Sequence, residues 1–316
     1  MLKNVQLVFL ILCCCCLSSV LYAQKDTKFW FVAPEVTQGA NNDDRPVAFR
    51  FFSYDDAATI TISQPANPAF PVQTLILAAN SSGILELPPL FNFVENTPAD
   101  AVLDKGFLIE SNSLITAYYE VIGALQSNTE IFSLKGKNAM GTEFYVPFQN
   151  ILDNSSLSPS ARSSFDIVAS EDNTSVTIIP TQDIVGHIAN IPFTITLNRG
   201  ETYSAEAVSQ SAAGHPAGSK VSADKPIAIT MKDDMVDASL AFGDFCVDLI
   251  GDQIVPIEKT GTRYVLQKGG LLQQEAAMIL ATADGTAISF DGNPLGVLNA
   301  GESLPIVVSD RHYIES

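Results

Sequence analysis

The sequence has few charged residues, few histidines and, beyond its N-terminal segment, almost no cysteine. Charged side chains make up 16% of the 316 residues, with 17 basic against 35 acidic, for a net charge of −18. A chain without a clustered basic face has no electrostatic grip on phosphate backbones, so no nucleic acid is expected as a partner. Apolar residues, at 47%, are too abundant for a disordered acidic tail, and the sequence therefore predicts a folded core.

The histidines and cysteines offer little for catalysis or for a transition metal. His187, His215 and His312 stand in unrelated segments, and Cys246 is interpreted as a small buried residue. Nucleophilic catalysis needs a serine or cysteine with a positioned base, and the sequence has no G-x-S-x-G motif, phosphate loop or dinucleotide fingerprint. We therefore predict that the protein is not an enzyme and has no catalytic residue, cofactor or metal site.

Residues 1–23 have the pattern of a secretory signal peptide. Lys3 precedes an apolar stretch without acidic residues, and the small residue Ala23 before Gln24 marks the predicted cleavage site. A membrane anchor is one alternative, because the stretch is close to the shortest that spans a bilayer, and a lipoprotein signal at Cys13–Cys16 is another. Cleavage would leave Cys246 as the only cysteine, which excludes an intramolecular disulfide, and it would leave no transmembrane segment.

Self-comparison reveals a module that is repeated in tandem. Residues 165–178 align with residues 277–290 and with residues 49–62, and each copy has an alternating apolar run, a polar turn centred on aspartate and a second β-branched run. This is the pattern of a β-hairpin. With the flanking segments included, the three copies span residues 28–135, 141–255 and 261–316. The third copy is truncated, because it lacks the closing strand of the other two.

The repeated pattern predicts an all-β protein. Turn signals recur at intervals of about 8–12 residues, and no helical periodicity lasts longer than two turns. Residues 271–280 are the nearest candidate for a helix. We expect tandem β-sandwich-like modules of about 110 residues each. A β-propeller-like arrangement of four-stranded units fits the same number of strands and is the alternative.

Paired aspartates are the strongest hint of a chemical site, because such pairs act in glycosidases and bind Ca²⁺. They occur at Asp43-Asp44, Asp55-Asp56 and Asp233-Asp234. The repeat favours a structural role, because Asp56, Asp172 and Asp284 occupy the same turn position in the three copies. An aspartate in such a turn bonds to its own backbone. No D-x-D-x-D-G calcium loop is present.

Four aromatic residues either form a binding patch or fill the core. They are Phe51, Tyr54, Tyr118 and Tyr119. Because they lie in runs with strand alternation, we expect them in the core rather than in an exposed patch. The sequence therefore predicts no particular ligand-binding residue.

Two segments resemble the N-terminal domain of IgG Fc-binding proteins. One is Cys246–Pro256 followed by Gly261–Val265, which is similar to the inter-repeat signature of that family, and the other is Phe165–Pro180. The resemblance is clear from about residue 141 to residue 265 and assigns residues 24–316 to such a domain. It implies a secreted, non-enzymatic binding module, which in bacteria often stands at the front of a long surface protein.

These observations lead to two hypotheses of function. The first is a secreted or cell-surface protein-interaction or adhesion module that binds an extracellular protein or glycoprotein, with glycans as a further partner class. The alternative is a carbohydrate-binding or accessory module of a larger surface enzyme. In either case we expect the natural chain to continue past Ser316 with a closing strand, and to be attached to the surface through a C-terminal part.

Overall fold

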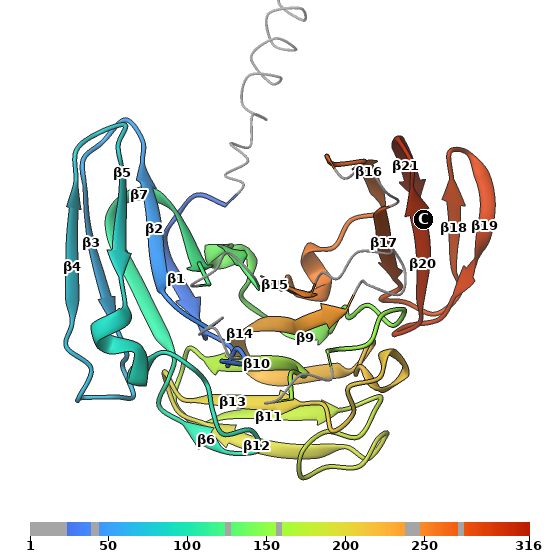
Figure 1. Ribbon diagram of the computed structural model, residues 1–316, viewed down its shortest axis with the longest axis horizontal. Coiled ribbons are helices and arrows are strands. Elements are labelled where there is room, and N and C mark those ends of the chain that lie inside the picture. The colour runs from blue at the N-terminus through green and yellow to red at the C-terminus, as the bar shows by residue number, and fades with distance from the viewer. Residues whose placement is uncertain (1–23, 39–43, 124–127, 156–159, 238–246, 271–274) are drawn as a thin grey trace, which may run out of the picture.

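The computed structural model describes residues 24–38, 44–123, 128–155, 160–237, 247–270 and 275–316. The predicted signal peptide, including Ala23, lies outside the described residues, as do Asp43 and Cys246. Within the described residues, no helix is both long and apolar enough to cross a membrane. The described residues form three groups of strands, with the second group between the first and the third (Figure 1).

The first unit is a seven-stranded sheet built around one long strand, β7. Its strands are β1 (Asp26–Phe31), β2 (Val47–Ser53), β3 (Ala58–Ser63), β4 (Gln73–Leu77), β5 (Ser82–Glu86), β7 (Phe107–Val121) and β8 (Glu130–Leu134). The first half of β7 pairs with β1 and β3, and its second half pairs with β2 and β8. The chain thus forms two four-stranded halves that share β7 and enclose one core rich in phenylalanine.

The second unit repeats this pairing with β14 in the place of β7. Its strands are β9 (Gly141–Tyr145), β10 (Ser163–Ala169), β11 (Thr174–Ile179), β12 (Phe193–Leu197), β13 (Thr202–Glu206), β14 (Lys220–Asp237) and β15 (Val247–Gln253). The first half of β14 pairs with β9 and β11, and its second half pairs with β10 and β15. An eighth strand, β6 (Val102–Leu103), comes from the connection between β5 and β7 of the first unit and pairs with β13. The first two units are therefore interlocked.

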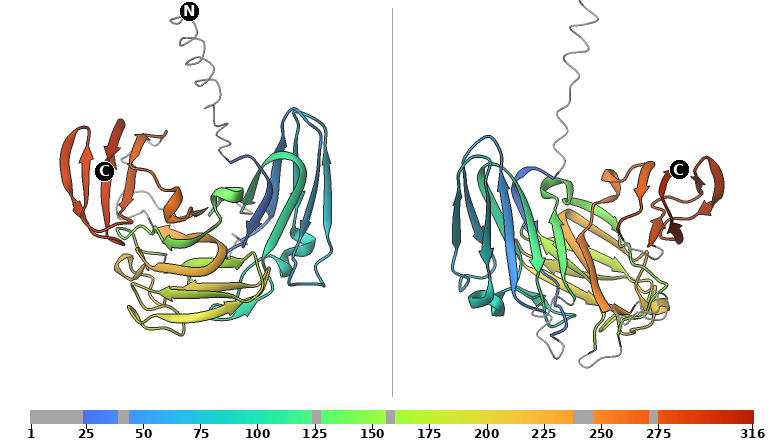
Figure 2. Two further views of the ribbon diagram at one scale, coloured as in Figure 1. Left: turned by 180° about the vertical axis from the view of Figure 1, so that it is seen from behind. Right: turned by 45° about the horizontal axis from the view of Figure 1, so that its top comes forward.

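The third unit consists of two separate sheets. One contains β16 (Arg263–Gln267), β18 (Thr286–Phe290), β19 (Asn293–Leu298) and β21 (Arg311–Glu315), and the other contains β17 (Glu275–Leu280) and β20 (Ser303–Val308). Its core has three buried residues, Ile288, Ile306 and Ile314, and is much smaller than the cores of the other units. The third unit lies on the side of the second unit that faces away from the first (Figure 2). Among the described strands, it shares no sheet with the second unit.

The strands confirm the prediction of an all-β protein. The described residues contain no α-helix, and the 3-10 helices are short: η1 (Pro88–Phe93), η2 (Gly136–Asn138), η3 (Ala212–Gly214) and η4 (Ile257–Lys259). Of the candidate helix at residues 271–280, residues 275–280 form β17 and pair with β20, and residues 271–274 lie outside the described residues. The two halves of each of the first two units share one core and one long strand, so they are not the separate blades of a propeller.

The hairpin corners of the three units have the same backbone hydrogen bond. These bonds run from Ser53 N to the Ser81 oxygen at 2.9 Å, from Ala169 N to the Glu201 oxygen at 3.1 Å and from Ala281 N to the Glu302 oxygen at 3.0 Å. The turn aspartates add a second link. Asp172 Oδ1 accepts a hydrogen bond from Arg199 N, and Asp284 Oδ1 accepts one from Ala300 N, both at 3.0 Å. These two aspartates thus bond to the turn of the next hairpin and tie two turns together.

Two glycines bring the second and third units into close backbone contact. Gly218 has a φ of +78°, and a Cβ atom there would lie 2.0 Å from the Gly301 carbonyl oxygen. We expect Gly218→Ala to lower the free energy of unfolding by about 1–3 kcal/mol, because it combines an unfavourable φ with a clash against backbone. Gly285→Ala is the matched control, because Gly285 has a φ of +68° and open space around it. Equal losses for the two variants in urea denaturation would contradict the contact.

Candidate functional site

The paired aspartates that the structure describes lie in different environments. The Asp44 side chain is buried and accepts two hydrogen bonds from Arg45, at 3.1 and 2.8 Å. Asp55 and Asp56 are exposed. Asp233 and Asp234 are buried on β14, but their side chains contact different groups of residues. Within the described part of the chain, no group of three or more histidine, cysteine, aspartate or glutamate side chains is placed to hold a metal ion.

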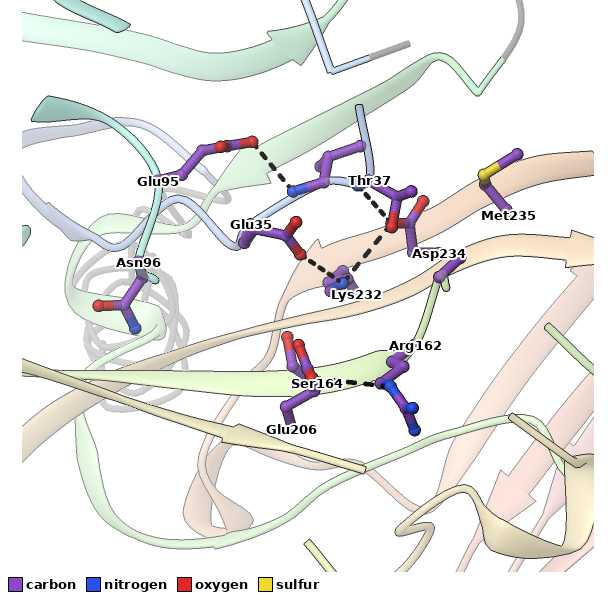
Figure 3. Close-up of polar contacts among 12 residues, drawn as sticks. Glu35, Thr37, Glu95, Asn96, Arg162, Ser164, Glu206, Lys232, Asp234 and Met235 are labelled. Carbon is purple, nitrogen blue, oxygen red and sulfur yellow. Dashed lines mark hydrogen bonds and ion pairs between the residues drawn. The ribbon is translucent and has the colours of Figure 1, made fainter. Parts of the chain in front are cut away.

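A buried cluster of charges around Lys232 lies where β14 faces the first unit (Figure 3). The Lys232 side chain is buried, and its Nζ lies 3.3 Å from Glu35 Oε2 and 3.6 Å from Asp234 Oδ2. Glu35 belongs to the segment after β1, so the ion pair joins residues of the first and second units. We call Glu35, Lys232, Asp234 and the residues hydrogen-bonded to them the Lys232 cluster.

Two residues of the first unit hold the Asp234 carboxylate in place. The backbone N–H of Thr37 donates to Oδ2 at 2.7 Å, and Asn128 Nδ2 donates to Oδ1 at 2.8 Å. Both of these residues are buried. A buried carboxylate is tolerated only when hydrogen bonds and an opposite charge replace its lost hydration, and Asp234 has both.

The acidic surroundings keep Lys232 charged. Burial alone would lower its pKa, but Glu35, Asp234, Glu206 and Asp166 outweigh burial and raise the pKa above the ordinary value for lysine. A lysine that acts as a nucleophile needs a lowered pKa, so that its amine is neutral near pH 7. Lys232 therefore acts as a permanent cation that holds the two units together.

The second part of the interface centres on Asp166 of β10. Burial raises its pKa to about 6, although Asn96, Ser164 and Ser204 donate hydrogen bonds that work against the rise. Asn96 Nδ2 donates to Asp166 Oδ1 at 2.7 Å, and Asn96 Oδ1 accepts from Thr202 Oγ1 at 2.6 Å. Because Asn96 lies on the segment that also carries β6, this network fixes β6 against β13.

The opposite side of β14 holds a separate network between Asp233 and His215. His215 Nδ1 lies 3.4 Å from Asp233 Oδ2, and His215 Nε2 lies 2.9 Å from Asn154 Oδ1. Gln149 Nε2 and Asn154 Nδ2 donate to the Asp233 carboxylate, both at 2.7 Å. Burial raises the pKa of Asp233, while His215 is the largest of the effects that lower it. His215 and Asp233 are both buried, so this pair packs the second unit and does not face solvent.

The segment that carries the inter-repeat signature joins the second unit to β8 of the first. Asp252 Oδ1 accepts a hydrogen bond from Ser133 N, and Gln253 Oε1 accepts one from Lys135 N, both at 2.8 Å. Gln253 Nε2 also donates to the carbonyl oxygen of Trp30 at 2.7 Å. The signature residues that the structure describes are therefore part of the contact between the two units.

The four aromatic residues divide between the core and its rim. Phe51 and Tyr119 are fully buried in the core of the first unit, and Tyr54 and Tyr118 are half-buried. The burial of Phe51 and Tyr119 agrees with the expectation that these residues fill the core. They do not form an exposed aromatic patch.

The connection between β11 and β12 exposes a group of aliphatic side chains. It spans residues 180–192, whereas the corresponding connections are residues 64–72 in the first unit and residues 291–292 in the third. Ile188 is 70% exposed and Ile191 is 59% exposed, with Val185 beside them in the sequence. We call residues 180–192 the β11–β12 loop. Long loops on a rigid scaffold are common places for binding residues.

This loop is held in one conformation by its own contacts. Ile184 and His187 exchange two backbone hydrogen bonds of 3.0 Å, and the His187 ring stacks on Phe193 at 3.4 Å between centroids. His187 Nε2 also lies 3.1 Å from Asp100 Oδ1, on the segment that leads to β6. His312 is in a different environment in the third unit, where its Nδ1 lies 2.8 Å from Asp291 Oδ2. A fixed loop loses little conformational entropy when it binds a partner.

Neither the Lys232 cluster nor the network around Asp166 was among the sites expected from the sequence. The signals were the run Lys232-Asp233-Asp234 directly after the apolar alternation of residues 226–231, and a single aspartate, Asp166, inside the apolar run 165–169. Charges within otherwise apolar strands indicate buried ion pairs or a covered polar face. The partners Glu35 and Asn96 had no such signal, because they are distant in the sequence and lie in irregular segments.

Comparisons with known proteins agree with the resemblance found in the sequence. A family model described as IgGFc binding protein matches residues 129–316. No curated protein matches the chain. Among solved structures, the chain is similar to a crystal structure of Bacteroides uniformis beta-glucuronidase with a TM-score of 0.17 and 9% identity, over 76% of this chain and 26% of that chain. The chain thus spans about a quarter of that enzyme, and a likeness at this level supports no inference. Because the family model covers more than half of the chain, the protein belongs to the IgG Fc-binding protein family.

Proposed function

We propose that the chain is a secreted, non-enzymatic module for protein interaction or adhesion that binds an extracellular protein or glycoprotein. The observation that carries this proposal is the match of residues 129–316 to a family of binding proteins. The matched residues include the β11–β12 loop. The charged groups of the Lys232 cluster bind to one another and to residues of both units, which supports a structural role rather than contact with a substrate. Secretion follows from the signal pattern of residues 1–23, with cleavage between Ala23 and Gln24.

The three units are proposed to be tandem copies of one module, bounded as residues 28–135, 141–255 and 261–316. The support is the common pairing of the long strands β7 and β14 and the common corner hydrogen bond. In this arrangement the Lys232 cluster and the strand β6 hold the first two copies in a fixed orientation. A fixed orientation presents the β11–β12 loop to a partner without further ordering.

The β11–β12 loop is proposed as the surface that meets the protein partner. Exposed aliphatic groups on an ordered loop lose water on binding, and this release is the main driving force of most protein association. The exposed aliphatic side chains of the loop suit contact with an apolar protein surface better than contact with the hydroxyl groups of a sugar. We expect the affinity to depend on Ile188 and Ile191, which are the most exposed of the loop's aliphatic residues.

Binding to immobilised glycoproteins tests this function. The purified chain is passed over the Fc fragment of immunoglobulin G and a panel of other extracellular glycoproteins, each before and after enzymatic removal of its glycans. Saturable binding that survives deglycosylation is expected. No binding to any protein of the panel, together with binding on a glycan array, would contradict protein recognition.

The double variant Ile188→Asp, Ile191→Asp is expected to weaken that binding by at least about tenfold, because charged side chains would have to lose water in an apolar contact. Ile76→Asp is the matched control, since Ile76 is 74% exposed on β4 of the first unit. It should bind like the parent chain. If the loop variant keeps both the parent affinity and the parent melting temperature, the β11–β12 loop is not the binding surface.

A further inference from the structure

A residue of the first unit contacts the β11–β12 loop of the second. Asp100 lies on the connection between β5 and β7, and its backbone N–H donates to the Ser204 oxygen of β13 at 3.1 Å. Its Oδ1 accepts a hydrogen bond from the Tyr203 hydroxyl at 2.8 Å and lies 3.1 Å from Nε2 of His187, in the loop. One side chain of the first unit therefore contacts both a strand and the loop of the second.

The backbone on both sides of this contact has a positive φ. Asp100 has a φ of +56°, and Gly186, in the β11–β12 loop, has a φ of +80°. Both residue types suit this conformation, glycine because it has no Cβ and aspartate because its short side chain forms hydrogen bonds nearby. A Cβ atom at Gly186 would lie 2.0 Å from Asp100 Oδ2. The loop backbone thus approaches the carboxyl group as closely as only glycine allows.

The first unit has no equivalent of this arrangement. In the alignment of the repeats, Phe51 corresponds to Ile167. Phe51 lies opposite Gly83 of β5, whereas Ile167 lies opposite Tyr203 of β13. Among the described strands, β5 pairs with β2 alone, but β13 pairs with both β10 and β6. The first unit therefore folds with glycine in the place of the tyrosine that binds Asp100, which points to a role other than folding for this contact.

The strand β6 brings an exposed aliphatic side chain to the same place. Val102 of β6 is 48% exposed and lies opposite Tyr203 of β13. Side chains that lie opposite each other in antiparallel strands are neighbours on one face of the sheet. The Tyr203 ring is 6.1 Å from the Phe193 ring, on which the His187 ring stacks. A continuous row of side chains thus leads from Val102 to His187, which directly precedes the exposed Ile188.

The charges around this row indicate the chemistry of the partner. Asp100 and, within the loop, Asp183 are exposed, and the chain has a net charge of −18. The basic side chain of Arg162 is paired with Glu206, at 3.9 Å. Opposite charges on two surfaces favour their encounter and fix their orientation. An apolar centre with an acidic rim therefore fits a protein surface that has apolar side chains surrounded by lysine or arginine.

We propose that the first two units share one binding surface. Asp100 is a positioning residue that fixes the β11–β12 loop, and Val102 is a further contact residue for the partner, a protein surface with an apolar centre and a basic rim. This inference rests on the proposed function, because it extends the surface that Ile188 and Ile191 define. Binding then requires that the two units remain joined.

Amide hydrogen exchange, measured by NMR on the purified chain without a partner, tests the role of Asp100. The Ile184 and His187 amides each donate to the other residue's carbonyl oxygen at 3.0 Å. We expect Asp100→Gly to speed their exchange by at least about tenfold, because the loop loses its anchor. Glycine is used because it adopts a φ of +56° without strain. Asp100→Asn should restore the protection, since its side-chain oxygen can still accept from Tyr203.

Asn80→Gly is the matched control for this measurement. Asn80 has a φ of +52° at a turn of the first unit, and its replacement should leave the exchange of the loop amides unchanged. Asp100 does not position the loop if Asp100→Gly leaves the exchange unchanged or if the control speeds it equally. The same conclusion follows if Asp100→Asn exchanges as fast as Asp100→Gly.

The affinity for a protein of the panel that binds the parent chain tests the role of Val102. We expect Val102→Asp to weaken binding by at least about tenfold without a change in loop exchange, because a charged side chain must lose water in an apolar contact. Val72→Asp is the matched control, since Val72 is 60% exposed in the first unit, and it should bind like the parent. Raising the salt concentration from about 0.1 M to about 1 M should also weaken binding, because salt screens the basic rim.

Failure of this inference is distinguishable from failure of the proposed function. If the double variant Ile188→Asp, Ile191→Asp loses binding but Val102→Asp binds like Val72→Asp, the loop binds the partner and the first unit does not share the surface. Binding that is independent of salt would contradict a basic rim. If no protein of the panel binds, the proposed function and the contact role of Val102 fail together, and the exchange measurement still decides the role of Asp100.

Discussion

Replacement of Lys232 by methionine is expected to lower the free energy of unfolding by about 3–5 kcal/mol at pH 7, because it leaves buried carboxylates without their cation. Glu35 and Asp234 lie within 3.6 Å of the ammonium group, and the side chain of Lys232 is buried. Methionine fills a similar volume, so the loss reports the charge and not a cavity. Urea denaturation, followed by far-UV circular dichroism, measures it.

Two further variants identify the cause of that loss. Lys220→Met removes an exposed ion pair with Glu143, at 3.1 Å, and should change the stability by less than about 1 kcal/mol. Adding Glu35→Gln and Asp234→Asn to Lys232→Met should restore part of the stability, because the two carboxylates that pair with the lost ammonium group are then neutral. If Lys232→Met is as stable as the parent chain, the cluster does not hold the two units together.

The second large effect is expected at Glu95, and it depends on pH. Burial raises the pKa of Glu95 to about 8, with smaller contributions from Glu35 and Asp44, although the N–H of Val36 donates to it at 3.0 Å. The folded state therefore holds a proton that the unfolded state releases above pH 4.5. The stability from this group is complete below pH 4.5 and is lost as the pH rises toward 8. At about 1.4 kcal/mol per pKa unit, the loss reaches several kcal/mol.

The variant Glu95→Gln should remove this pH dependence, because glutamine does not titrate and its oxygen can still accept the bond from Val36. At pH 5 its stability should resemble that of the parent chain, and at pH 9 it should exceed it by several kcal/mol. Glu86→Gln, at an exposed position of β5, is the control and should follow the parent curve at both values. If the free energies of unfolding of the parent chain and of Glu95→Gln change equally between pH 5 and pH 9, the folded state does not hold Glu95 protonated.

Part of the fold could be predicted from the sequence because it depends on short-range pattern. Alternation of apolar and polar residues, with Asp, Asn and Gly at the turns, predicts hairpins without knowledge of their neighbours. The same local pattern, seen at residues 49–62, 165–178 and 277–290, indicated the repeat. Residues 275–280 have good helix formers, but their pairing with β20 makes them a strand, as the alignment of residues 277–290 with the other hairpins predicts.

Only the tertiary structure decided which residues meet across the first two units. Asp233 and Asp234 are adjacent in the sequence, but the alternation of a strand sends one to His215 and the other to Lys232. The partner Glu35 is about 200 residues from Lys232, and no local pattern specifies such a distance.

The sequence by itself therefore determined that this is an all-β member of the IgG Fc-binding family built from similar hairpins. It could do so because strand alternation and turn residues act over a few positions. The tertiary structure decided that a charged cluster and the strand β6 join the first two units. These features depend on burial and on long-range pairing, which arise only when segments distant in the sequence come together.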